Sequence, residues 1–168
     1  MNLVVSDASP IRYLVAIGAI HILPELFSKV IIPEFVITTE LQGRKTPSKV
    51  KEWASNPPSW VDVRKPAKLE ILNLHTGEEE AIALALELRT PIQLDEKEAR
   101  GVAKRKGLLV IGTIGLLELA ASKHLVDLTH ALAALQKTNM RVHPSLLQAA
   151  LKRQIGVPTK PPQEGSIE

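Results

Sequence analysis

The sequence predicts a single α/β domain built around a parallel sheet of five strands. Five short runs rich in Val, Ile and Leu, each bounded by polar residues, Pro or Gly, have the length of buried strands. Helical patterns lie between these runs, and strands that alternate with helices form parallel sheets with right-handed crossovers. The chain has 168 residues, of which 45% are hydrophobic, so it can bury one substantial core but not two.

The predicted elements follow one another in a regular order. Strands are predicted at residues 3–5, 30–32, 60–63, 92–94 and 109–111. Helices are predicted between them at residues 10–27, 33–42, 77–88 and 96–106. After the last strand the pattern is helical, at residues 114–122, 128–137 and 145–153. The domain is therefore expected to span residues 1–155, and the Pro-rich residues 156–168 to form a disordered C-terminal tail.

Composition excludes several classes of protein. The chain has no cysteine, which excludes disulfide frameworks, thiolate zinc sites and cysteine nucleophiles, and fits a reducing cytosol. No stretch approaches the roughly 20 apolar residues of a membrane span and the N-terminus does not resemble a signal peptide, so a cytoplasmic protein without a membrane partner is expected. A net charge of +3 and a pI near 9.2 permit a polyanionic partner without requiring one.

Four acidic residues stand at the ends of predicted elements, where a parallel sheet would gather them. They are Asp7, Glu40, Glu80 and Asp95. Asp7 follows the first strand, and parallel α/β sheets bind their ligands at the carboxyl ends of the strands. The next helix already has Ser9 as its N-cap and Pro10 at its first position, so Asp7 is left without a capping role and is a candidate for function.

The other three acids each have a structural alternative. Glu40 falls in the last turn of a helix, where the dipole disfavours a negative charge by ~0.3–1 kcal/mol, so it is either compensated or a solvated surface residue. Glu80 heads an apolar helix behind a capping box at residues 76–79, and we expect its carboxylate to face the crevice and that of Glu78 to face solvent. Asp95 fits either a cap of the next helix or a metal ligand.

Carboxylates that converge on one crevice repel one another. Each close pair costs on the order of 4 kcal/mol at an effective dielectric constant of 20. A bound Mg²⁺ or Mn²⁺ removes this cost, because both are hard cations that prefer oxygen ligands. The five histidines show no zinc-binding spacing, and the Walker A, dinucleotide-binding and nucleophile-elbow motifs are absent. The residues therefore predict divalent-metal chemistry on phosphate esters.

An ordered series of segments resembles the PIN-domain family, and more narrowly its VapC-like prokaryotic branch. The segments are VVSDASPI, IIPEFVITTEL, HTGEEEAIALALEL, IQLDEKEARGVAKRKG and LLVIGTIGLLELA, in that order. The resemblance runs from about Leu3 to Arg153. It implies a three-layer α/β/α sandwich and metal-dependent cleavage of RNA, often by the toxin of a toxin–antitoxin pair.

The resemblance also implies roles for individual residues. The acidic set of the family falls on Asp7, Glu40, Glu80 and Asp95, and the implied metal ligands are Asp7, Glu80 and Asp95. Ser9 matches a small hydroxyl residue two positions after the first acid. Thr113 matches the threonine of a Gly-Thr segment near the metal, with an N-cap of the following helix as the alternative. Many members carry Asp in place of Glu80, which leaves direct or water-mediated ligation open.

We therefore expect an endoribonuclease that depends on Mg²⁺ or Mn²⁺, in which a metal-activated water attacks phosphorus in line and Glu40 positions or deprotonates that water. Basic residues near the acids are candidates for holding RNA, although charged helix faces are usually just solvated. These residues are Lys97, Arg100, Lys104 and Arg105 after Asp95, and Arg44, Lys45, Lys49 and Lys51 after Glu40. The alternative is a catalytically inactive PIN-like scaffold that acts by binding protein or RNA.

The same residues also bear on further partners and on a second alternative function. An antitoxin protein and a homodimer are expected of PIN toxins, and the apolar helices at 11–26 and 128–135 would supply the dimer face unless they build the core. A phosphotransfer domain with an acceptor aspartate is disfavoured. The segment after Asp7 lacks a second Asp, and residues 109–111 lack the lysine that receiver domains place there.

Overall fold

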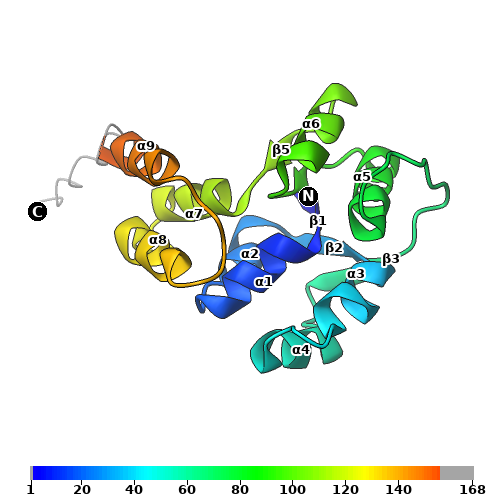
Figure 1. The fold of residues 1–168 in the computed structure, drawn as a ribbon, viewed down its shortest axis with the longest axis horizontal. Coiled ribbons are helices and arrows are strands. Elements are labelled where there is room, and N and C mark those ends of the chain that lie inside the picture. The colour runs from blue at the N-terminus through cyan, green and yellow to red at the C-terminus, as the bar shows by residue number, and fades with distance from the viewer. Residues whose placement is uncertain (1, 156–168) are drawn as a thin grey trace, which may run out of the picture.

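A single sheet of five strands organises the computed structural model, which describes residues 2–155 (Figure 1). The strands are β1 (Leu3–Ser6), β2 (Lys29–Pro33), β3 (Val61–Arg64), β4 (Ile92–Gln93) and β5 (Val110–Ile111). All neighbouring strands are parallel, in the order β3-β2-β1-β4-β5. The central strand is β1. Strands β2 and β3 lie on one side of it and β4 and β5 on the other, so the strand order reverses between β1 and β4. The five predicted parallel strands are confirmed.

Helices fill the connections between the strands and form the C-terminal part. They are α1 (Ala8–Ala16), α2 (Ile22–Leu26), α3 (Glu34–Thr38), the 3-10 helix η1 (Glu40–Gln42), α4 (Ser48–Ser55), α5 (Thr76–Leu88), α6 (Lys97–Arg105), α7 (Thr113–Ser122), α8 (Leu128–Gln136) and α9 (Pro144–Ile155). In the part of the chain described here, none of these helices is both long and apolar enough to cross a bilayer. The tail predicted at 156–168 lies outside the described residues.

Two predicted helices have different boundaries in the structure, and one further helix was not predicted. The helix predicted at 10–27 is divided into α1 and α2, because the intervening turn places Gly18 at a φ of +71°. The helix predicted at 33–42 ends at Thr38 and continues as η1. Helix α4 was not predicted, since its apolar stripe is narrow and polar residues dominate its sequence.

The sheet separates two apolar clusters, so the molecule has three layers. Val4, Val30 and Ile32 face one cluster, which α1, α2, α4, α7 and α8 complete. Val5 and Ile31 face the other cluster, which α5 and α6 complete. In Figure 1, α7, α8 and α9 group at one end of the molecule, away from α5.

The apolar helices considered as a dimer face contribute to the core instead. Ile11, Leu14, Ile22 and Leu135 are fully buried, and Leu132 is 3% exposed. Burial of such side chains stabilises the fold by ~1.5–3 kcal/mol each. Their apolar surface is therefore already used within one chain.

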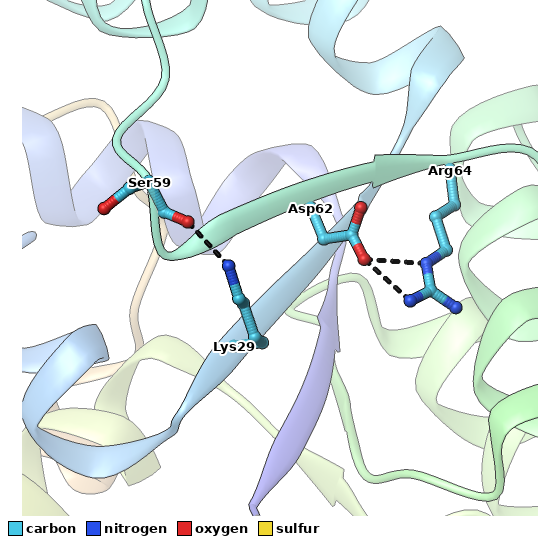
Figure 2. Close-up of polar contacts among 4 residues, drawn as sticks. All are labelled: Lys29, Ser59, Asp62 and Arg64. Atoms are coloured by element: carbon cyan, nitrogen blue, oxygen red, sulfur yellow. Dashed lines mark hydrogen bonds and ion pairs between the residues drawn. The ribbon is translucent and has the colours of Figure 1, made fainter.

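Polar contacts protect the edge of the sheet at β3 (Figure 2). Lys29 Nζ donates to the carbonyl oxygen of Ser59 at 2.7 Å. Arg64 pairs with Asp62 two residues earlier on the same strand, with Nη2 2.7 Å from Oδ2. Charged side chains on an edge strand discourage pairing with another sheet. Asp62 is thus an acid with a structural role at the edge of the sheet.

Candidate active site

Two of the predicted acids lie at the reversal of strand order. Asp7 directly follows β1, and Asp95 comes two residues after β4, its neighbour in the sheet. The Asp7 N–H donates to the carbonyl oxygen of Gln93 at 3.1 Å, which fixes the two strand ends relative to each other. Open α/β sheets bind ligands in the crevice at such a switch point. The topology therefore puts both carboxylates at the position where this fold class binds ligands.

Asp7 is buried, and one oxygen of its carboxylate is unpaired. The residue is 5% exposed, and its Oδ1 finds no hydrogen-bond partner among residues 2–155. Helix α1 begins at Ala8, so Asp7 itself occupies the N-cap position and the prediction of Ser9 as N-cap was wrong. The Asp7 side chain nevertheless makes no capping hydrogen bond. Ser9 lies half-buried in the first turn of α1.

Asp95 is bound to Thr113 by two hydrogen bonds. The Thr113 N–H donates to Asp95 Oδ1 at 2.7 Å, and Thr113 Oγ1 donates to Oδ2 at 2.7 Å. The N-cap of α6 is Glu96, and the N-cap of α7 is Gly112. Both capping alternatives were therefore wrong. The Asp95 carboxylate is held at the N-terminus of α7, where a negative charge is favoured.

Glu40 lies against the start of α5. Its Oε1 accepts a hydrogen bond from the Gly77 N–H at 3.1 Å. A Cβ atom at position 77 would lie 2.1 Å from that oxygen, so a glycine is needed for this approach. Of the two alternatives left open for Glu40, the structure favours a compensated acid, because the amino end of α5 favours its charge, although Glu40 begins η1 and does not lie in the last turn of a helix.

The acids at the start of α5 differ from the predicted arrangement. Helix α5 begins at Thr76, and the carboxylate of Glu78 accepts a hydrogen bond from the His75 N–H at 3.2 Å. The predicted box at 76–79 is therefore displaced by one residue. Glu78 is 6% exposed, so the expectation that it faces solvent was wrong. Glu80 is half-buried, and its Oε2 makes no hydrogen bond within the described residues.

Burial and repulsion by neighbouring acids raise the pKa values of Asp7 and Glu40. Burial, followed by the charge of Glu40, raises the pKa of Asp7 from 3.8 to about 7, with smaller contributions from Glu78 and Asp95. Burial also raises the pKa of Glu40, against the Gly77 N–H and the charge of Arg12, which lower it. Asp7 is therefore the acid of this region whose ionisation is least favourable.

Burial likewise raises the pKa of Glu78 and that of Asp95. For Asp95 the two hydrogen bonds from Thr113 act in the opposite direction and lower the pKa. Asp7 responds electrostatically to Glu40, Glu78 and Asp95, and Glu40 responds to Glu80, so we refer to these five carboxylates as the acid cluster. Clusters of carboxylates with raised pKa values are typical of functional sites.

Sequence reasoning missed two residues of this region. Glu78 acts electrostatically on Asp7, and its position was detectable, since it shares a helix face with the apolar residues Ala81, Ile82 and Ala85. Tyr13 is half-buried, and burial raises its pKa, while the charges of Arg12 and Asp95 act on that pKa in opposite directions. No pattern in the sequence singles out Tyr13.

The cluster suits a hard cation in its chemistry. All donors are carboxylate oxygens, and the orphaned oxygens of Asp7 and Glu80 are groups that a cation would satisfy. Within residues 2–155, no three acidic or histidine side chains already stand in the arrangement of a metal site. The carboxylates of the described residues are thus electrostatically coupled without being arranged as a metal site.

Comparison with known proteins gives a family match. The model of a family described as DUF3368, a PIN domain, matches residues 3–155. Among solved structures, the chain is similar to a PilT N-terminus domain protein from the hyperthermophilic archaeon Sulfolobus solfataricus P2. The sequence identity is 16%, the TM-score is 0.42, and the match covers 85% of this chain and 100% of that chain. No curated protein matches.

Proposed function

The chain belongs to the PIN-domain family, whose model spans residues 3–155, and from this premise we propose that it is a metal-dependent endoribonuclease. The family has a nuclease fold. The observation that carries the proposal is the buried Asp7 carboxylate, which lies at the switch point with an oxygen that no described residue satisfies. A protein tolerates such a group where function requires it.

The proposed mechanism uses carboxylates from four segments of the chain. Asp7, Asp95 and an acid of α5, either Glu80 or Glu78, would hold one or two Mg²⁺ or Mn²⁺ ions. The cation would supply an activated water and shield the charge that develops on the phosphate. Glu40 would position that water and accept its proton, because the amide of Gly77 keeps its carboxylate in place. Thr113 would hold Asp95 in the orientation for ligation.

Metal titration combined with an RNA cleavage assay tests this proposal. Asp7→Asn keeps the size of the side chain, and it is expected to abolish cleavage and to weaken Mn²⁺ binding at least tenfold. Asp62→Asn is the matched control, since that acid lies at the sheet edge and pairs with Arg64. Unchanged metal affinity and cleavage in a folded Asp7→Asn protein would contradict the nuclease proposal.

The alternative, an inactive scaffold, predicts a different result. The parent protein would then bind RNA or a protein without taking up Mn²⁺, and the RNA would stay intact. Glu78→Gln and Glu80→Gln, compared in the same assay, identify the ligand on α5. We expect the larger loss of Mn²⁺ affinity at the residue that binds the ion directly.

The proposed biological role is that of a toxin countered by an antitoxin protein. Expression of the parent chain is then expected to arrest growth, and expression of Asp7→Asn is not. A homodimer is also proposed, on a surface other than the buried faces of α1, α2 and α8. Size-exclusion chromatography with light scattering tests the oligomeric state.

A further inference from the structure

Helix α5 carries apolar side chains on two faces, and the sheet covers one of them. Ala81, Leu84 and Ala85 are buried in the cluster that lies against the sheet. On the other face Ala83 is half-buried and Leu86 is 37% exposed. A helix that is apolar all round is normally covered on all sides. The outer face of α5 is therefore a surface that the core does not fully use.

The connection from β3 to α5, residues 65–75, runs along this outer face (Figure 1). Two glutamates of α5 hold it in place. Glu87 Oε2 accepts a hydrogen bond from the Ala67 N–H at 3.0 Å, and Glu79 Oε2 accepts one from the Leu72 N–H. A groove of about 780 Å³ lies between the connection and the helix, and we refer to it as the α5 groove.

The lining of the α5 groove follows one side of the helix. From α5 it includes Glu79, Ile82, Ala83, Leu86 and Glu87, and from the connection Ala67, Lys68, Leu69, Glu70 and Leu72. The helix residues are spaced by three and four positions, which places them on a common face. The small Ala83 lies between larger neighbours, so side chains of a second helix can pack into the depression above it. The shape of the groove thus suits a helix.

Two apolar side chains of the connection are exposed at the α5 groove. Leu69, which lines the groove, is 50% exposed, and Ile71, which lies between two lining residues, is 84% exposed. Single exposed apolar residues are common on protein surfaces, whereas an apolar groove with further exposed apolar residues beside it marks an interaction site. The connection therefore adds apolar surface to that of α5.

The charges of the α5 groove indicate the chemistry of the partner. The lining contains three glutamates and a single lysine, although the chain as a whole has a net charge of +3. Glu70 pairs with Lys106 at 2.6 Å, whereas Glu79 and Glu87 form no ion pair within residues 2–155. These acids repel nucleic acid and disfavour a second copy that presents the same acids. They favour a partner with cationic side chains.

The α5 groove is separate from the acid cluster. Among the residues that the structure describes, no member of the cluster belongs to the groove lining. A ligand in the groove therefore contacts the outer face of α5 and does not replace a metal or a substrate at the cluster. An inference about this groove goes beyond the proposed nuclease function and does not rest on it.

We propose that the α5 groove binds an amphipathic helix of a partner protein, in which Lys or Arg residues flank an apolar stripe. The apolar stripe contacts Ile82, Ala83 and Leu86. The cations lie beside Glu79 and Glu87, and the exposed apolar side chains of the connection cover one flank of the bound helix. Recognition of this kind places the apolar face of a helix in a groove of the receptor.

Binding of a labelled model peptide to the full chain, followed by fluorescence anisotropy, tests the proposal. The peptide has about 18 residues, with leucines along one helical face and lysines on the others. Leu69→Ser combined with Ile71→Ser changes exposed side chains, so the fold is retained, and it is expected to weaken binding about tenfold. Glu87→Gln keeps the size of the side chain and is expected to weaken binding about threefold at low salt, with a smaller loss at high salt.

Matched controls come from other parts of the chain and from the peptide itself. Leu146→Ser changes a 56% exposed leucine of α9, and Glu25→Gln changes an exposed acid of α2. Binding by each of these variants is expected to stay within about twofold of the parent value. A peptide of the same composition without a continuous apolar face, and one with glutamate in place of lysine, are both expected to bind at least about tenfold more weakly.

Several results would overturn the proposal. They are no binding of the leucine–lysine peptide to the parent protein, equal binding of either control peptide, and equal losses in the control variants. A parent dimer that Leu69→Ser with Ile71→Ser converts to a monomer, measured by size-exclusion chromatography with light scattering, would assign the groove to a second copy instead. RNA cleavage is not a readout of this experiment, so the proposed function and this inference can fail separately.

Discussion

At the scale of single residues, the electrostatic state of Asp7 dominates the site. Its carboxylate is buried next to other acids, so its ionised form is unfavourable in the metal-free protein. In the folded protein its pKa is about 7, compared with an ordinary value of 3.8. Between these pH values the folded state keeps a proton that the unfolded chain has released. Stability therefore falls as pH rises through this window, by on the order of 4 kcal/mol in total.

Asp7→Asn is expected to remove this pH dependence. Without metal at pH 8, the variant should be more stable than the parent protein by ~1–3 kcal/mol, less than the full amount because the buried amide also lacks partners. At pH 4 the two proteins should be nearly equal. Urea unfolding in the presence of a chelator at both pH values measures the difference. A variant that is less stable than the parent at pH 8 would show that the Asp7 charge is compensated in the folded protein.

The hydroxyl of Thr113 offers a second test at this scale. Thr113→Val keeps the shape of the side chain but removes the 2.7 Å hydrogen bond to Asp95 Oδ2. Its removal is expected to cost ~1–3 kcal/mol of stability and to weaken Mn²⁺ binding, because a buried carboxylate loses a donor. Thr113→Ser retains the hydroxyl and is the control. Calorimetric Mn²⁺ titration and urea unfolding of both variants decide whether the hydroxyl or only its volume matters.

At the scale of elements, the amino end of α5 organises one side of the site. It supplies Glu78 and Glu80, and its Gly77 N–H holds Glu40, which comes from a segment 37 residues earlier. The approach depends on the missing side chain at position 77. Disrupting this hydrogen bond would displace an acid that lies outside α5.

Gly77→Ala is therefore expected to destabilise the protein, although Ala normally favours a helix by up to ~1 kcal/mol. The added Cβ would overlap Glu40 Oε1, so Glu40 must move, at a cost of ~1–3 kcal/mol. Gly115→Ala in α7 is the control, because its Cβ would make ordinary contact with Ile111 at 3.5 Å. Thermal unfolding should show a lower midpoint for Gly77→Ala and a higher midpoint for Gly115→Ala than for the parent protein. An unchanged or raised midpoint for Gly77→Ala would mean that Glu40 is not held as described.

The sheet was predictable from the sequence, while several connections were not. Runs such as Leu3–Ser6 are apolar on both faces, which is the signature of a buried parallel strand. Helix boundaries depend on local contacts that periodicity does not record, and the left-handed turn at Gly18 divided a continuous apolar pattern. The four acids were found because each stands at the end of an element. The partners of Glu40 and Asp95 come from distant segments, so the sequence alone did not identify them.

The inward orientation of Glu78 was missed for another reason, although its helix face could have been detected. A run of three glutamates at a helix start is explained electrostatically whichever of them faces inward. Successive residues of an α-helix lie ~100° apart around its axis, so a different choice of face for α5 changes which acid of the run is buried. For this reason the sequence prediction placed Glu78 in solvent, whereas the structure buries it.

At the scale of the whole molecule, the proposed metal site predicts that stability depends on divalent cations. A ligand that binds only the folded state adds ~1.4 kcal/mol for each tenfold increase above its Kd. The unfolding midpoint of the parent protein is therefore expected to rise with the logarithm of Mn²⁺ concentration, and excess chelator should reverse the rise. NaCl at matched ionic strength is the control for general screening. An equal rise in Asp7→Asn would place the stabilising cation elsewhere.

The residues that build the site are widely spaced along the chain. The acid cluster and its supporting hydroxyl extend from Asp7 to Thr113. A ribosome synthesises the first of these groups long before the last. The nascent polypeptide therefore carries an incomplete acid cluster until the segment that contains Thr113 has been translated.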